Sequence, residues 1–303
     1  MSRAWLEQPE RGSLFALRLM ARFALFFGWR ASRLLLYPIT AYFLLFAPVA
    51  RRASRQFLER VLGPVVSLGD VYRHLFCFAS VILDRVYFLS GRADDYRIDV
   101  VGADAFEAAA ARGGVVLLGS HLGSFEVMRL LAMRRAIKVR PLMYEANAAQ
   151  MRAVFGRLNP ALAAEVIALG EPTAMLQVKE SLARGECVGF LGDRIAGGDK
   201  TIAVDFLGRP AELPAGPFLV AAALKAPVVM FFGLHRGPRH YEVRFQGLDD
   251  GGGLPAEAGD DRNRRVQPMG QRYADCLAFH VRLAPYNWFN FFDFWERPGD
   301  GAG

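Results

Sequence analysis

The chain has 303 residues, a length that fits one large domain with an appendage better than two full domains. Apolar residues make up 53% of it, which is high for a soluble enzyme and low for a protein that crosses a membrane many times. The formal net charge is +7, and arginine supplies almost all of the positive charge. The sequence contains no zinc-finger, homeodomain or RNA-recognition motif, so an anionic lipid or an acidic carrier protein is favoured over nucleic acid as a partner.

An uncharged apolar stretch lies near the N-terminus. Residues 34–50, LLLYPITAYFLLFAPVA, are at the short limit for a membrane-spanning helix, and Pro38 predicts a kink within them. Arginines flank the stretch on both sides, so the positive-inside rule gives no orientation. We expect an uncleaved membrane anchor that lies partly within one leaflet; the alternative is a helix buried in the globular fold.

Beyond residue 62 the sequence alternates between extended and helical patterns, without internal repeats and without a Walker or dinucleotide fingerprint. Short apolar runs predict strands at residues 98–101, 114–119, 139–143, 166–169, 188–191, 228–232 and 241–245. Helical spacing predicts helices at residues 65–90, 105–111, 126–136, 148–158, 173–184, 217–224 and 266–282, the last preceded by a polar surface loop at residues 251–265. This alternation predicts an α/β fold with a mostly parallel central sheet flanked by helices. We expect membrane-associated helices over residues 1–62 and a catalytic domain over residues 63–303.

The most informative motif is VVLLGSHLGSFE, at residues 115–126. Its apolar run predicts a buried strand, so His121 falls just beyond the carboxyl end of that strand, where α/β proteins place their chemistry. With His121 on the turn and Glu126 in the following helix, the carboxylate can reach back and hold the imidazole in one tautomer. We predict that His121 is a general base oriented by Glu126; the alternative is a helix cap beside a solvated glutamate.

Further residues are candidates for binding the substrate. A base-catalysed attack on a carbonyl requires groups that stabilise the tetrahedral oxyanion, and backbone N–H groups near Gly123 or Gly192, or the side chain of Arg194, could supply them. Asp193 and Arg194 follow a buried strand, so they are either substrate contacts or a structural ion pair. Arg209 is a weaker candidate for binding the substrate.

The sequence predicts neither a metal site nor a bound cofactor. Cys77, Cys187 and Cys276 are isolated, with no Cys-x-x-Cys pair, which fits reduced thiols better than a disulfide framework. No Gly-x-Ser-x-Gly elbow supplies a serine nucleophile, so direct attack by the acceptor is the simpler scheme.

Six blocks of sequence occur in the order found in one known family. They are the His-x4-Glu block at residues 121–126 and the blocks at residues 140–147, 186–194, 204–217, 226–233 and 286–295. Over roughly residues 31–295 the chain resembles the late acyltransferases of lipid A biosynthesis, within the lysophospholipid acyltransferase superfamily. It is most similar to a branch of predicted acyltransferases associated with specialised acyl or aryl-polyene synthesis. Glu126 stands where many relatives have Asp, and Asp193-Arg194 where others have Asp-Gln, which puts the acceptor in doubt.

The resemblance implies an acyltransferase that transfers groups other than aminoacyl groups, at the cytoplasmic face of a bacterial inner membrane. It also implies an acyl-thioester donor, acyl carrier protein more than coenzyme A, and a membrane lipid as acceptor of the acyl chain on a hydroxyl or amine. An acyl-thioester hydrolase, in which the same base activates water, is one alternative. The other is a non-catalytic protein that binds lipid or the carrier.

Overall fold

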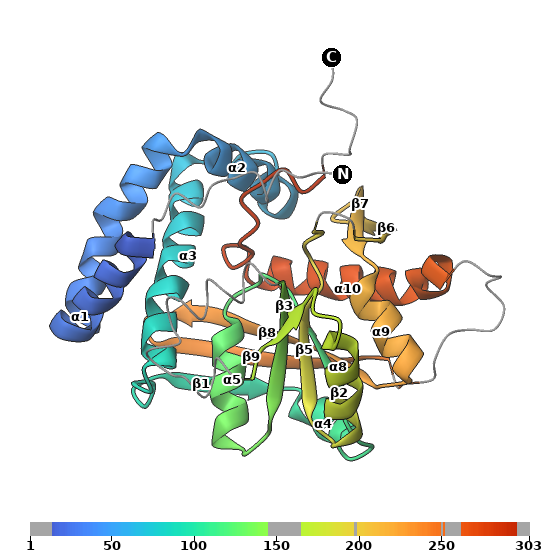
Figure 1. Ribbon diagram of the computed structural model, residues 1–303. Helices are drawn as coiled ribbons and strands as arrows, with labels where there is room; N and C mark the ends of the chain where they lie inside the picture. Colours follow the sequence, from blue (N-terminus) through green and yellow to red (C-terminus); the bar gives the residue numbers. More distant parts are fainter. Residues whose placement is uncertain (1–13, 145–164, 197–198, 250, 252–261, 296–303) are drawn as a thin grey trace.

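The computed structural model describes residues 14–144, 165–196, 199–249, 251 and 262–295, and its elements are labelled in Figure 1. The helices are α1 (Leu14–Phe46), α2 (Pro48–Leu62), α3 (Leu68–Leu89), α4 (Ala103–Ala110), α5 (Phe125–Arg134), α8 (Ala174–Ala183), α9 (Gly216–Leu224) and α10 (Arg262–Leu283). The strands are β1 (Arg97–Val101), β2 (Val115–Gly119), β3 (Val139–Tyr144), β4 (Ile167–Leu169), β5 (Cys187–Leu191), β6 (Thr201–Phe206), β7 (Arg209–Pro214), β8 (Val228–Gly237) and β9 (His240–Asp249). The expected helix at residues 148–158 lies outside the described residues, as does most of the expected loop at 251–265.

Seven strands form one sheet in the order β1-β9-β8-β2-β5-β3-β4. Every neighbouring pair is parallel except β8 and β9, which are antiparallel. The predicted α/β fold with a mostly parallel central sheet flanked by helices is therefore confirmed. The strand order also places β2 beside β5, which is far from it in the sequence.

The central strand β2 separates two hydrophobic cores, because successive side chains of a strand point to opposite faces of the sheet. Val116 and Leu118 pack into the core that includes residues of α8, α9 and α10. Val115 and Leu117 pack into the core formed with α1, α4 and α5, while α3 contributes to both. All five residues of β2 are buried, which explains why the strand is a continuous apolar run.

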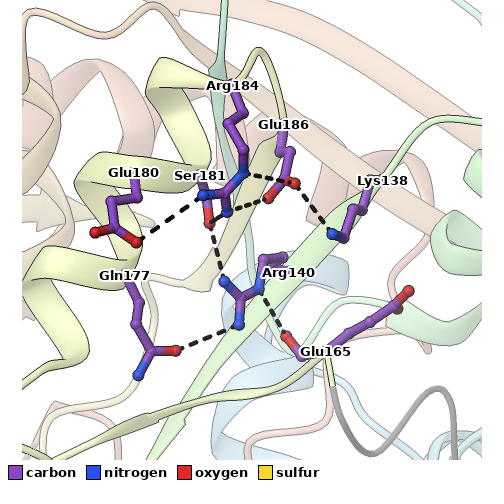
Figure 2. Close-up of polar contacts among 8 residues, drawn as sticks. All are labelled: Lys138, Arg140, Glu165, Gln177, Glu180, Ser181, Arg184 and Glu186. Atoms are coloured by element: carbon purple, nitrogen blue, oxygen red, sulfur yellow. Dashed lines mark hydrogen bonds and ion pairs between the residues drawn. The ribbon is translucent and has the colours of Figure 1, made fainter.

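Hydrogen bonds and ion pairs fasten the N-terminal ends of β3 and β5 to the last turns of α8 (Figure 2). Arg140 donates to Ser181 Oγ at 3.1 Å and to Gln177 Oε1 at 3.3 Å. Glu186 pairs with Lys138 at 3.0 Å and with Arg184 at 3.1 Å. This network lies at the opposite end of these strands from His121, so we assign it a structural role.

A two-stranded antiparallel hairpin, β6–β7, stands apart from the main sheet and was not among the predicted strands. Its turn residues Leu207 and Gly208 both have positive φ, as a type I′ turn requires. Leucine is an uncommon first turn residue, and the prolines and glycines of this segment obscured the alternation of buried and exposed side chains.

The N-terminal helices pack on α3, beside which α1 lies in Figure 1. Trp29 Nε1 of α1 donates to Asp84 Oδ1 at 2.7 Å, and Tyr87 Oη donates to the Ala24 carbonyl at 2.7 Å. α1 is broken at Gly28, whose φ of 81° lies outside the helical region. Among the described residues no single helix is long and apolar enough to cross a membrane. One pair of helical segments, residues 19–46 and 48–62, has the length and composition to do so together, but the two are bent by 94° relative to each other.

The outer face of these helices is apolar and exposed. Ala24 and Leu36 are buried, but the opposite side of the helix carries exposed large side chains. We call these the apolar stripe: Leu34, Tyr37, Tyr42, Leu45, Phe46 and Val49. The alternative of a helix fully buried in the fold therefore does not describe α1.

Candidate active site

His121 lies where the sequence predicted, just beyond the carboxyl end of β2 and before α5 begins at Phe125. β5 runs parallel to β2 and ends at Leu191, so Asp193 follows it at the same edge of the sheet. Parallel pairing of β2 with β5 therefore brings two side chains that are 72 residues apart into contact.

His121 and Asp193 form a closely held pair. His121 Nδ1 lies 2.8 Å from Asp193 Oδ1, and the backbone N–H of His121 donates to Asp193 Oδ2 at 2.9 Å. Two further donors reach the same oxygen Oδ2, namely Trp288 Nε1 at 3.0 Å and Asn290 Nδ2 at 2.9 Å. Because the ionised carboxylate only accepts hydrogen bonds, the proton of the neutral ring belongs on Nδ1 and the lone pair on Nε2.

The electrostatic environment keeps the two groups in these forms. Burial alone would raise the pKa of Asp193. The charges of His121 and Arg194 and the hydrogen bonds from His121 outweigh that effect and lower the pKa to about 2. Burial and the charge of Arg194 lower the pKa of His121, against the opposing effects of Asp193 and Glu126. The His121 side chain is nevertheless 26% exposed, so a substrate can reach it. At neutral pH the ring is therefore an uncharged base beside an ionised carboxylate.

The structure contradicts the expectation that Glu126 contacts the imidazole, because Asp193 occupies the position beside Nδ1. Glu126 Oε1 instead lies 2.6 Å from Arg85 Nε on α3, and its side chain is only 9% exposed. Its charge still raises the pKa of His121, but as the weakest of the resolved contributions. A residue five positions along a turn and helix points away from the ring, whereas the neighbouring strand places Asp193 directly against it.

The two glycine N–H groups considered for the oxyanion are both used inside the fold. The Gly123 N–H donates to the Asn287 carbonyl at 2.8 Å, and the Gly192 N–H donates to the Gly119 carbonyl at 3.0 Å. Gly123 has a φ of +76°, and a Cβ atom at this position would lie 1.9 Å from the Gly233 carbonyl oxygen. This close approach, rather than substrate binding, explains the glycine.

Arg194 lies beside the pair but is hydrogen-bonded to the C-terminal segment, residues 286–295. Its Nε donates to Asn290 Oδ1 at 2.7 Å, and its Nη2 donates to the Phe289 carbonyl at 2.9 Å. The first of these contacts holds Asn290 in place, and Asn290 in turn donates to Asp193. Arg209 is exposed on the β6–β7 hairpin, where its charge acts on Arg60 of α2. Substrate binding by either arginine stays a prediction.

The C-terminal segment completes the site, and its polar residues were not among the predicted site residues. Leu122 and Trp288 form an antiparallel bridge, and the Phe289 N–H donates to the His121 carbonyl at 2.8 Å. Asn287 and Asn290 are both buried. Two asparagines inside the aromatic run YNWFNFFDFW were the available signal, because a buried amide needs hydrogen-bond partners.

The cysteines lie outside this constellation. Cys77, Cys187 and Cys276 are free and buried, and burial raises the pKa of each thiol to about 12. In the part of the chain that the structure describes, no group of three or more His, Cys, Asp or Glu side chains could hold a metal ion.

One family of known proteins matches the chain. The family described as bacterial lipid A biosynthesis acyltransferase matches residues 74–296, a span that includes His121, Asp193 and the C-terminal segment. No curated protein is significantly similar to the chain.

Proposed function

The chain belongs to the bacterial lipid A biosynthesis acyltransferase family and is an acyltransferase, and on that premise we propose its substrates, mechanism and location. It moves an acyl chain from an acyl thioester, carried by acyl carrier protein, to a hydroxyl or amine of a lipid-like acceptor. It does so at the cytoplasmic face of a bacterial inner membrane. The observation that carries this proposal is the contact of 2.8 Å between His121 Nδ1 and Asp193 Oδ1 at the end of the central strand.

The mechanism follows from the tautomer of His121. Nε2 takes the proton of the acceptor hydroxyl or amine while that oxygen or nitrogen attacks the thioester carbonyl carbon. The ionised carboxylate of Asp193 stabilises the imidazolium that forms. When the tetrahedral intermediate collapses, the carbon–sulfur bond breaks, and His121 returns the proton to the leaving thiolate. The products are the acylated acceptor and the free thiol of the carrier, with no cofactor consumed.

The apolar stripe supports attachment to a membrane. Leu34 is 67% exposed and Leu45 64% exposed, and Phe26 at the Gly28 break is 82% exposed. An exposed arginine, Arg30, precedes the stripe, where it can contact anionic headgroups. We place this face in one leaflet, so that the site opens close to a lipid acceptor.

Hydrolysis is the second candidate, because water can also reach a His121 side chain that is 26% exposed. In that case the same base would activate water, and the acyl group would leave as a free acid.

One experiment separates transfer from hydrolysis. The purified full-length protein is incubated with labelled acyl carrier protein, with and without a bacterial membrane lipid extract, and the label is followed into lipid and free acid. We expect label in lipid only when the extract is present. Label that appears as free acid at the same rate with or without lipid would identify a hydrolase and contradict the proposal. The same incubation with acyl-CoA determines which donor is used.

A further inference from the structure

Arg60 and Arg209 come from distant parts of the chain and lie on two elements that meet at Trp295. Arg60, in the last turn of α2, places its guanidinium 4.2 Å from the centre of the Trp295 ring. Arg209 begins β7 and pairs across the hairpin with Phe206. The Phe206 carbonyl accepts a hydrogen bond from Trp295 Nε1 at 3.2 Å, and the two rings are stacked at 6.0 Å. Trp295 thus contacts Arg60 of α2 and Phe206 of the hairpin, beside which Arg209 lies across the strand pair.

Among the described residues, no carboxylate forms an ion pair with Arg60. Its Nε atom is buried and has no hydrogen-bond acceptor within the described residues. Burial and the charge of Arg209 lower the pKa of Arg60, and the opposing charges of Asp293 and Glu59 do not compensate. The charge of Arg209 therefore acts on the partly buried guanidinium of Arg60, and an anion bound by both arginines would relieve this repulsion.

Two tryptophans connect Arg60 with the catalytic pair. Trp295 contacts Trp288, with ring centres 6.2 Å apart, and Trp288 donates directly to Asp193. On the other side, α2 continues from the apolar stripe, which ends at Val49. An anion held by Arg60 would therefore lie between the proposed membrane surface and His121.

We propose that Arg60 and Arg209 bind the phosphate group of a phosphorylated lipid acceptor. Phosphate suits them because its oxygens can accept paired N–H donors from the planar guanidinium groups. Phosphate is also the anion that lipid headgroups carry at the depth where the apolar stripe would place α2. The inference rests on the proposed function, because it assumes that the acceptor is a lipid.

The test measures binding of the full-length protein to vesicles, without turnover. Three vesicle types are compared: phosphatidylcholine alone, phosphatidylcholine with phosphatidic acid, and phosphatidylcholine with the same mole fraction of a fatty acid. The variant Arg60→Gln/Arg209→Gln is compared with Arg52→Gln/Arg55→Gln, which removes the same charge from the exposed face of α2. Arg60→Lys/Arg209→Lys keeps the charge but loses the planar fork, and it serves if the glutamine variant folds poorly.

We expect the wild-type protein to prefer phosphatidic acid over the fatty acid by at least about tenfold, as charge-assisted hydrogen bonds to phosphate allow. Arg60→Gln/Arg209→Gln should lose that preference, the lysine pair should lose much of it, and Arg52→Gln/Arg55→Gln should keep it. An equal loss in both glutamine variants would mean general charge attraction and would overturn the proposal.

Free phosphate is tested separately by thermal melts with inorganic phosphate. Stabilisation by phosphate that is lost in Arg60→Gln/Arg209→Gln, without any vesicle preference, would identify a site for free phosphate and refute the lipid assignment. Vesicle binding needs no acyl transfer, so the two proposals can fail separately. If the proposed activity is wrong, the wild-type protein produces no labelled lipid in the transfer assay. If the phosphate site is wrong, the wild-type protein shows no preference for phosphatidic acid in the vesicle assay.

Discussion

Replacing Asp193 by asparagine should disable the base without removing its contacts. Four donors converge on this carboxylate: His121 Nδ1 on Oδ1, and the His121 N–H, Trp288 Nε1 and Asn290 Nδ2 on Oδ2. An asparagine that keeps its oxygen toward the three donors must turn its NH2 group toward His121 Nδ1. That arrangement requires Nδ1 to accept, so the ring proton moves to Nε2, which then cannot take a proton from the acceptor.

The expected loss is large. General base catalysis contributes roughly 10²–10⁴-fold to the rate, and an Asp-to-Asn change behind a catalytic histidine in serine hydrolases costs about 10⁴ in kcat. We therefore expect kcat for Asp193→Asn to fall at least about 10²-fold. The melting temperature should change little, because all four contacts stay hydrogen-bonded, one with its direction reversed, and a buried charge is removed.

Glu126→Gln is the matched control, since it also neutralises a buried carboxylate near His121. It weakens the contact of 2.6 Å with Arg85. We expect a stability loss of roughly 1–3 kcal/mol, as for a mostly buried polar group that loses its charged partner, and a kcat per folded molecule close to that of the wild type.

The assay is the initial rate of labelled acyl transfer over a range of donor concentrations, with thermal melts on the same preparations. The reasoning would be refuted if kcat fell at least about 10²-fold in Glu126→Gln and stayed near the wild-type value in Asp193→Asn. That outcome would return the orienting role to Glu126.

Three further predictions concern the membrane, the C-terminal segment and pH. Leu34→Glu/Leu45→Glu should weaken vesicle binding at least about tenfold, because each side chain loses apolar burial in lipid. Met133→Glu/Leu176→Glu changes two side chains that are exposed elsewhere and should bind vesicles as the wild type does. Equal co-sedimentation of the two variants with vesicles would contradict the assignment of the apolar stripe to the membrane. Asn290→Ala should lower kcat more than it raises KM and should change the pH profile, because Asp193 loses a donor; a lowered melting temperature with an unchanged pH profile would indicate a merely structural role. Burial lowers the pKa of His74 to about 4, against the effect of its hydrogen bond to the Trp288 carbonyl. Between about pH 6.5 and 4 the unfolded chain therefore binds a proton at this residue that the folded protein does not, and the free energy of unfolding should fall as the pH falls, by about 2 kcal/mol at pH 5. Urea denaturation measures this decrease, which should be less steep in His74→Gln.

The position of His121 could be predicted because it depends on local sequence. A buried run of five residues specifies β2, and the turn that follows places the histidine at the edge of the sheet. The partner of His121 could not be predicted in the same way. It depends on β5 lying beside β2, and hydrophobic periodicity gives the strands but not their order.

The remaining parts of the site also depend on long-range contacts. Trp288 and Asn290 reach Asp193 across 95 and 97 residues, so no local pattern connects them. The convergence of Arg60 with Arg209 depends on the β6–β7 hairpin, which has an unusual turn sequence and was not predicted. Gly123 lies close to His121 in the sequence, but the backbone contact with Gly233 that requires a glycine depends on the position of β8.

The most direct test of the account is single-turnover acyl transfer by His121→Ala beside the wild-type protein, at equal concentrations of folded protein. Labelled acyl carrier protein and membrane lipid extract are mixed with each, and labelled lipid is measured over time. The account predicts transfer by the wild type and a rate at least about 10²-fold lower for His121→Ala, with an unchanged melting temperature. Transfer by His121→Ala at a rate near that of the wild type would contradict it.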